Sequence, residues 1–143
     1  MKDWFTLGEQ AAQDLLTPAL LFYSDRIDRN IHQMIAIAGD AVRLRPHVKT
    51  YKCRELVQRQ LEAGICKFKC ATLAELEMLM QLQVPDILLA YPLVGPEQDV
   101  FRQWSVAYSG RLSVLIDHSS QVEAWQSDPS VPIHCFIDLN VGM

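Results

Sequence analysis

Segments with the pattern of β-strands alternate along this chain with segments of helical periodicity. The strand-like segments span 42–50, 67–71, 86–91, 112–117 and 133–139, and amphipathic helical stretches lie between them. Consecutive strands that are separated by helices pair in parallel through right-handed crossovers. Several of these strands are apolar on both faces, as expected for a parallel sheet that helices cover. The alternation therefore predicts an α/β fold built on a parallel sheet.

One more strand and one more helix are expected before this series. Residues 19–23 are apolar and predict a strand. Ser24 and Asp25 are suitable N-cap residues for the next helix. Its apolar positions recur at helical spacing until Gly39, which is suited to a helix end.

Local signals mark the starts of later helices. Thr72 and Glu75 form a capping box, in which the hydroxyl and the carboxylate satisfy each other's backbone amides. Ser120 and Glu123 repeat this spacing. Pro96 suits the first turn of a helix. These signals place helices directly after three of the predicted strands.

An open doubly wound sheet and a (β/α)8 barrel both fit this pattern. The chain lacks the Gly-x-Gly-x-x-Gly turn of dinucleotide-binding sheets and the Walker A loop, which favours the barrel. Strand centres recur roughly every 20 to 26 residues, and a complete barrel needs about 200 residues or more. We therefore expect an N-terminal fragment of a TIM-type barrel with about five β/α units, comprising a lead-in (1–16) and a barrel portion (17–143). A complete small α/β domain is the alternative.

Composition excludes several other classes of protein. The chain is 50% hydrophobic and 21% charged with a net charge of -4, and no basic block suggests nucleic-acid binding. It has no apolar run long enough for a membrane helix and no signal-peptide pattern, so we expect a cytoplasmic protein. The cysteines lack zinc-site spacing and are expected to be reduced thiols: Cys53, Cys66, Cys70 and Cys135.

The segment 43–50 carries the strongest chemical signal. Strand alternation places four basic residues on one face: Arg43, Arg45, His47 and Lys49. Their apolar neighbours would face the outer helices, so the basic set would point into the barrel, where a phosphate or an anionic substrate would compensate its charge. Lys49 ends the strand at the catalytic mouth, and its neutral amine can form a Schiff base with an aldehyde cofactor. A solvated basic face on an edge strand is the alternative reading.

Four segments carry a family resemblance in order and spacing: Thr17-Pro-Ala-Leu20, Arg45-Pro-His-Val-Lys-Thr-Tyr-Lys52, Cys70-Ala-Thr-Leu-Ala-Glu75 and Asp86-Ile-Leu-Leu-Ala-Tyr-Pro-Leu-Val-Gly-Pro96. They resemble the N-terminal barrel of the D-threonine aldolase and D-serine dehydratase family. That family belongs to the alanine-racemase-like fold type (fold type III) of pyridoxal-phosphate enzymes. The resemblance runs from about Thr17 to the end of the chain.

Several residue roles are implied by this resemblance. Lys49 matches the lysine that forms the Schiff base with pyridoxal 5'-phosphate and acts as a general base during turnover. His47 and Arg45 match residues that shape the cofactor pocket. Tyr51 stands where the family often has a histidine, which weakens any role for this position.

The end of the chain also resembles a family motif. Asp138-Leu-Asn-Val-Gly-Met143 is similar to a fifth-strand pattern that continues with an arginine near the pyridine nitrogen. The family's phosphate-binding glycine-rich loops and its second, β-rich domain with a divalent metal site also follow later. We expect a homodimer for the full-length protein, and no nucleic-acid or membrane partner.

The resemblance implies a lyase that acts on a small D-amino acid with a β-hydroxyl group. Retro-aldol cleavage and dehydration both remain open. A racemase would use the same lysine with a second base on the opposite face. A non-catalytic pyridoxal-phosphate-binding protein would use the lysine without turnover. An unrelated barrel without cofactor is the remaining alternative.

Weaker candidates end other strands at the expected mouth. Asp117, Asp138 and Tyr91 could face the pocket. His118 could instead cap a helix or lie in a loop. His32 falls on the first long helix, where a solvated position is expected.

Overall fold

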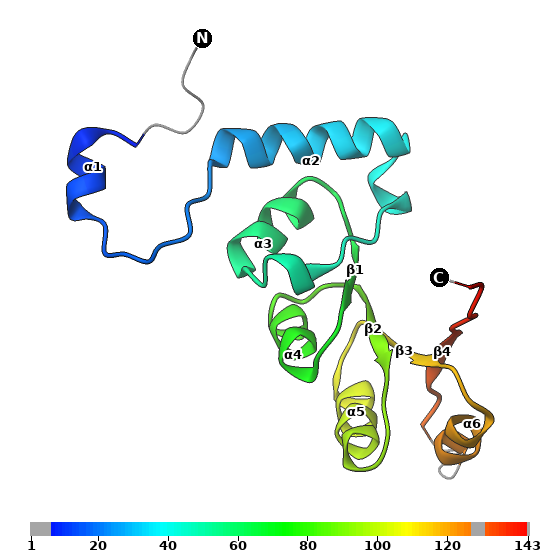
Figure 1. Ribbon diagram of the computed structural model, residues 1–143. Coiled ribbons are helices and arrows are strands. Elements are labelled where there is room, and N and C mark those ends of the chain that lie inside the picture. The colour runs from blue at the N-terminus through cyan, green and yellow to red at the C-terminus, as the bar shows by residue number, and fades with distance from the viewer. Residues whose placement is uncertain (1–6, 127–130, 143) are drawn as a thin grey trace.

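The computed structural model describes residues 7–126 and 131–142, and a parallel sheet forms its centre (Figure 1). The sheet has the order β1-β2-β3-β4, and all three neighbouring pairs are parallel. Its strands are β1 (Lys67–Cys70), β2 (Asp86–Pro92), β3 (Arg111–Ile116) and β4 (His134–Ile137). The predicted α/β class with parallel pairing is therefore confirmed. Residues 1–6 of the predicted lead-in and Met143 of the final motif lie outside the described residues.

Helices precede and separate these strands. They are α1 (Glu9–Asp14), α2 (Ser24–Ala38), α3 (Arg54–Glu62), α4 (Leu73–Gln81), α5 (Pro96–Ala107) and α6 (Ser119–Gln126). Two short 3-10 helices, η1 (Ala41–Arg43) and η2 (Val48–Thr50), lie between α2 and α3. Over the residues that the structure describes, no helix has the length and apolarity needed to cross a bilayer.

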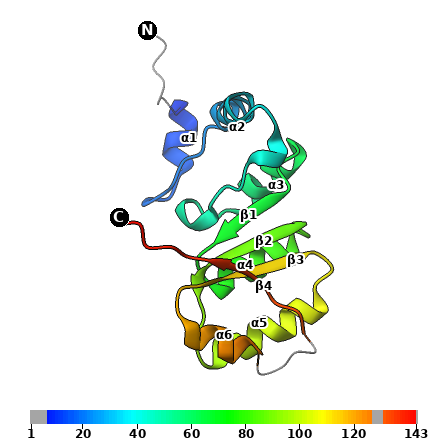
Figure 2. The ribbon, with the colours of Figure 1, turned by 90° about the vertical axis from the view of Figure 1, so that its right-hand side faces the viewer.

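The hydrophobic core lies between one face of the sheet and the helices. Phe68, Leu89 and Val114 alternate into this layer and are fully buried, where they meet Leu76 of α4 and Phe101 of α5 in one cluster. On the opposite face, which we call the inner face, none of the described helices is packed (Figure 2). The sheet is thus covered on one side only, as in the wall of a barrel. All four cysteines are free thiols, as expected.

Two predicted strands do not form. Residues 19–23 run in an arm that extends from the body with α1 and have no strand beside them (Figure 1). At the start of the 42–50 segment, η1 forms in place of a strand. The Asp40 carboxylate caps it by accepting a hydrogen bond from Val42 N. Pro46 has no N–H to donate to a ladder, so only the single parallel bridge between His47 and Lys69 remains.

The Thr72-x-x-Glu75 signal is confirmed at the start of α4. The Glu75 backbone N–H donates to Thr72 Oγ1 at 3.2 Å. The Glu75 carboxylate accepts from Ala71 N at 2.8 Å, one residue before the amide expected in a standard capping box. Pro96 occupies the first turn of α5 as expected, and Gly39 ends α2 in the left-handed conformation.

Two other cap predictions are wrong. Helix α2 already includes Ser24, so Tyr23 occupies the N-cap position and makes no side-chain cap. Helix α6 begins before Ser120, and the Ser120 backbone N–H donates to His118 Nδ1 at 3.1 Å. A helix that starts one residue early moves the expected cap side chain inside its first turn.

Gly110 provides a test of the tight turn into β3. A Cβ at this position would lie 2.9 Å from Pro85 O and 2.7 Å from the Tyr108 ring. We expect Gly110→Ala to lower the free energy of unfolding by roughly 1–3 kcal/mol, because backbone must move. Gly8→Ala, where nothing lies within 4 Å, is the control. Urea unfolding of both variants in the full-length protein measures the difference, and equal stabilities would contradict the packing described for this turn.

Candidate active site

The turn that carries Lys49 lies beyond the carboxyl end of β1. His47 is in register with Lys69, and β1 ends one residue later, so Lys49 lies past the edge of the sheet. Val48 anchors the turn in the core with no exposed surface, and its carbonyl accepts from the backbone N–H groups of Tyr51 (3.1 Å) and Lys52 (2.8 Å). The Lys49 side chain is exposed. The predicted position of Lys49 at the carboxyl edge is therefore observed, on a 3-10 turn rather than on a strand.

A row of residues crosses the inner face below this turn. The strand registers align His47, Lys69, Leu88, Ser113 and His134. Residues opposite one another in parallel strands point to the same face, and this row alternates with the buried helix-facing residues. Ser113 is 1% exposed, and its Oγ has no hydrogen-bond partner among the described residues. The row gives the inner face both cationic and hydroxyl groups beneath Lys49.

His47 links the bridge to the lysine turn. Its Nδ1 accepts from the Lys49 backbone N–H at 3.3 Å. Burial, followed by the nearby charges of Lys49 and Lys69, holds the pKa of His47 below its ordinary value, although Glu75 acts in the opposite direction. The imidazole is therefore neutral at pH 7, which leaves Nδ1 able to accept.

Proton NMR of the full-length protein tests this state of His47. We expect the imidazole to titrate with a midpoint below 6.5, the value of an unperturbed histidine. Because the unfolded chain then binds the proton more tightly, this group lowers native stability as the pH falls below 6.5 and has no effect above it. His47→Gln assigns the resonance. A midpoint at or above 6.5 would show that the described environment is wrong.

Arg45 is held by an acidic residue toward the amino end of the inner face. Its Nη1 and Nη2 donate to Asp86 Oδ1 and Oδ2 at 2.8 and 2.9 Å, and Nη1 also donates to Phe68 O at 3.3 Å. The guanidinium lies 5.8 Å from the centre of the Phe136 ring. Arg45 thus ties the segment before Lys49 to the first residue of β2. Its contact with a cofactor stays a prediction.

The Arg45–Asp86 pair has a matched control in the same chain. The two side chains are 21% and 18% exposed, whereas the Arg59–Asp28 pair is 40% and 46% exposed. We expect Asp86→Asn to lower the free energy of unfolding by roughly 2–4 kcal/mol, because it leaves a largely buried guanidinium without its counter-charge. Asp28→Asn should cost much less, because solvent screens this exposed pair. Denaturant unfolding of both variants measures the two losses of unfolding free energy. A larger loss for Asp28→Asn than for Asp86→Asn would refute the role of Arg45 as an anchor.

Arg43 of the basic segment and Tyr51, which follows it, make their contacts away from the inner face. Arg43 was expected on the inner face, but its Nη1 donates to Ala38 O at 2.9 Å, so it closes the end of α2. Because η1 replaces a strand here, side-chain alternation does not extend to Arg43. The Tyr51 hydroxyl donates to Gln60 Oε1 at 2.8 Å, and burial raises the pKa of Tyr51 well above its usual value. Tyr51 therefore packs against α3.

The carboxyl ends of β3 and β4 bring two candidate residues together. Asp117 and Asp138 line a hollow of about 580 Å³ with Asn140. Tyr91 is exposed near the end of β2. These side chains share the sheet edge with Lys49, so they remain candidates for ligand contact.

The remaining histidine candidates have local roles. His118 Nδ1 accepts from the Ser120 backbone N–H, which supports its capping role. His32 is exposed on α2 as expected, and its Nδ1 lies 2.7 Å from Asp28 O. Neither contact extends to the lysine turn.

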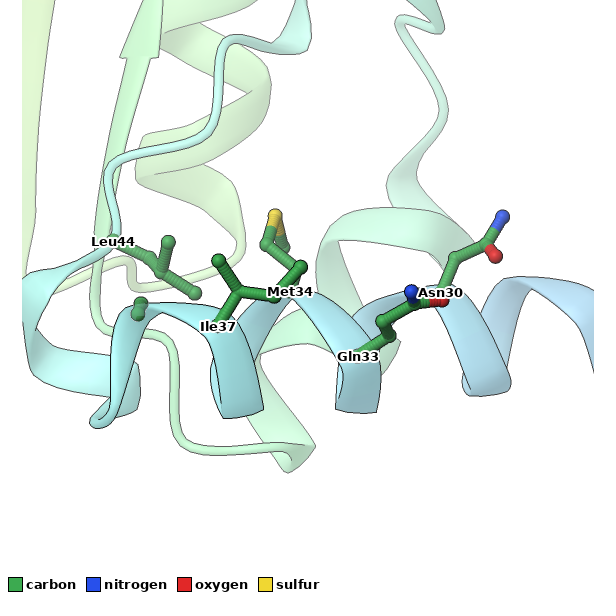
Figure 3. A pocket seen from close by; sticks show the side chains of 6 residues that line it. Asn30, Gln33, Met34, Ile37 and Leu44 are labelled. Atoms are coloured by element: carbon green, nitrogen blue, oxygen red, sulfur yellow. The ribbon is translucent and has the colours of Figure 1, made fainter.

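A second hollow lies along α2. It measures about 360 Å³ and is lined by Asn30, Gln33, Met34, Ile37, Ala38 and Leu44 (Figure 3). None of the predicted site residues lines it. The hollow is therefore not part of the candidate site.

Sequence reasoning did not identify three residues near the lysine turn. Lys69 shares the row of His47, and alternation within 67–71 could have placed it on the inner face. Lys52 and Glu75 form an ion pair at 3.3 Å. Lys52 lies in the Arg45–Lys52 motif and Glu75 in the Cys70–Glu75 motif, but the two residues are far apart along the chain, so the sequence gives no sign of their contact.

The comparisons with known proteins agree with this arrangement. The sequence model of the family "Alanine racemase, N-terminal domain" matches residues 23–143. D-threonine aldolase from Arthrobacter sp. is 28% identical over 130 residues, which are 88% of this chain and 34% of that protein. D-threo-3-hydroxyaspartate dehydratase from Delftia sp. (strain HT23) is 40% identical over 75 residues, which are 52% of this chain and 20% of that protein.

Solved structures support the same fold. The crystal structure of D-threonine aldolase from Filomicrobium marinum superimposes with a TM-score of 0.78 at 28% identity, covering 90% of this chain and 36% of that one. An alanine-racemase-like protein from Idiomarina loihiensis superimposes with a TM-score of 0.70 at 20% identity, covering 81% and 32%, and supports the fold alone. The chain spans about a third of the first relative's length. It belongs to the alanine racemase N-terminal domain family and corresponds to the N-terminal part of the D-threonine-aldolase-like, fold type III pyridoxal-phosphate proteins, whose fold is a TIM-type barrel.

Proposed function

We propose that the full-length protein is a pyridoxal-phosphate-dependent lyase of β-hydroxy-D-amino acids in which Lys49 holds the cofactor. The observation that carries this proposal is the position of Lys49. Its amine is exposed at the carboxyl edge of a parallel sheet, while the backbone on its amino-terminal side is fixed by Val48 and by the His47–Lys69 bridge. Barrel enzymes place their reacting groups at this edge.

The residues of the inner face fit such a cofactor. Lys49 supplies an accessible primary amine for covalent attachment. Lys69 is a cation on the same face, suited to the negative charge of a phosphate or of a carboxylate. The buried Ser113 Oγ, without a partner among the described residues, can donate or accept a hydrogen bond there.

The proposed chemistry assigns simple roles to the chain's own groups. When bound, pyridoxal phosphate supplies an electron sink that stabilises a carbanion of the substrate. Lys49 Nζ would bind the cofactor and, once the substrate amine has displaced it, would accept a proton as a general base. The neutral imidazole of His47 would orient the Lys49 backbone through its Nδ1. Arg45 would hold the preceding segment through Asp86.

The relatives favour substrates with a β-hydroxyl group over other amino acids. The two sequence relatives are named for D-threonine and D-threo-3-hydroxyaspartate, both of which carry this group. The aldolase covers more of this chain, whereas the dehydratase is more similar over a shorter stretch. We therefore retain cleavage and dehydration as two outcomes of the same site.

Visible absorption of the purified full-length protein with added pyridoxal phosphate tests the role of Lys49. We expect a Schiff-base band that borohydride abolishes and that is lost in Lys49→Ala. Lys67→Ala, which removes another lysine of the inner face near its amino end, should keep the band. A band of equal strength in Lys49→Ala, or no specific band in the wild-type protein, would refute the proposal.

Product analysis then separates the candidate reactions. An aldolase releases glycine and an aldehyde from D-threonine. A dehydratase releases ammonia and an oxo acid from D-serine or D-threo-3-hydroxyaspartate. Formation of the L-enantiomer would favour the racemase, and a Lys49-dependent band without any turnover would identify a non-catalytic binding protein.

A further inference from the structure

Glu75 is a buried carboxylate beside the lysine turn. It is 6% exposed and lies in the first turn of α4, where negative charge is favoured by the helix dipole. Oε2 accepts from Ala71 N at 2.8 Å, whereas Oε1 has no hydrogen-bond partner within the described part of the chain. Lys52 Nζ lies 3.3 Å from Oε1 and forms an ion pair with it. The second carboxylate oxygen therefore depends on Lys52 for its compensation.

Lys52 reaches this carboxylate from an unusual backbone conformation. Its φ is +46°, in the left-handed region that side chains other than glycine rarely adopt. Gln83 is the other non-glycine residue at positive φ in the described ranges, and it directly follows α4 and its C-cap. Strained residues of this kind persist where the surrounding contacts fix them, and they gather at functional sites.

Contacts on both sides of Lys49 hold the turn that carries it. On the amino-terminal side, Val48 is fully buried and His47 is bridged to β1. On the carboxyl-terminal side, the Lys52 backbone N–H donates to Val48 O, and the Lys52 side chain forms an ion pair with Glu75. Lys49 thus projects from a short turn whose entrance and exit are held by different parts of the sheet edge.

We propose that Glu75 is a positioning residue for the cofactor lysine, acting through its ion pair with Lys52. This inference rests on the proposed function of Lys49 and adds to it the group that fixes the exit of the turn. The Glu75 carboxylate fixes Lys52, and Lys52 holds the turn in the conformation that directs Lys49 to the cofactor. Displacement of a reacting group by about 1 Å can reduce a rate by about a hundredfold, so such an anchor has a chemical effect.

A purely stabilising role would not be distinguished by global stability. The Lys52 side chain is 63% exposed but the Glu75 side chain is only 6% exposed, so removing Lys52 leaves a buried carboxylate without its counter-ion. This loss lowers the unfolding temperature whether or not the pair positions Lys49. The test must therefore read the orientation of the bound cofactor rather than the unfolding temperature.

The experiment uses the full-length protein loaded with pyridoxal phosphate. The variants are Lys52→Met, Glu75→Gln, their double variant, and Lys52→Arg as the conservative replacement. Asp28→Asn, which removes a charge from the exposed ion pair between α2 and α3, is the matched control. Three quantities are measured for each: the cofactor dissociation constant, the visible circular dichroism per bound cofactor, and the unfolding temperature.

We expect Lys52→Met and Glu75→Gln each to weaken cofactor binding about tenfold and to lower the circular dichroism per bound cofactor. The double variant should be no weaker than either single variant, because both remove one shared contact. Lys52→Arg and Asp28→Asn should resemble the wild type.

Unchanged affinity and dichroism in Lys52→Met would overturn the inference, as would multiplying effects in the double variant. If Glu75→Gln does not fold, the substitution Lys52→Met, at an exposed side chain, still tests the inference. A wild-type protein without a Lys49-dependent band would instead refute the proposed function, so the two failures are distinct.

Discussion

The short parallel contact between the lysine segment and β1 is the constraint on which the candidate site depends. It consists of the His47–Lys69 bridge and the Lys69 N–H that donates to Pro46 O at 2.9 Å. Pro46 prevents a longer ladder, so the chain leaves the sheet immediately and turns through η2. This early exit places Lys49 beyond the edge of the sheet, while Val48 keeps the turn attached to the core.

Charge on the inner face is arranged unevenly around this contact. Asp86 compensates Arg45, and Glu75 compensates Lys52. Within the described ranges, Lys67 and Lys69 form no ion pair. The two paired cations fix the backbone on either side of Lys49. Lys69 leaves uncompensated positive charge on the inner face beneath Lys49, and Lys67 lies nearer the amino end of the same face.

Much of this fold could be predicted from the sequence, because the later strands carry both signals that define a buried parallel strand. The segments 86–91 and 112–117 are largely apolar, 67–71 alternates lysine with apolar residues, all three are followed by helices, and the observed strands match them closely. The strand predictions that are wrong concern 19–23 and 42–50, where composition suits a strand but no partner or donor completes the hydrogen bonding. Pairing is a tertiary property, so a local pattern cannot supply it.

The candidate site was predictable to a similar extent. Lys49 and His47 follow from one local motif, and both lie at the carboxyl end of β1, with Lys49 on a 3-10 turn rather than on the predicted strand. The contact between Lys52 and Glu75 joins residues from different β/α units, and alternation along either segment gives no sign of it. Long-range ion pairs of this kind depend on register and helix placement, which only the folded chain defines.

Peptide mapping by mass spectrometry, after borohydride reduction of the cofactor-loaded full-length protein, tests the central claim most directly. Four lysines lie close to the inner face or its edge, namely Lys49, Lys52, Lys67 and Lys69. The account predicts one pyridoxyl group per chain, attached to Lys49. Attachment to any of the other three, or spread among them, would contradict it.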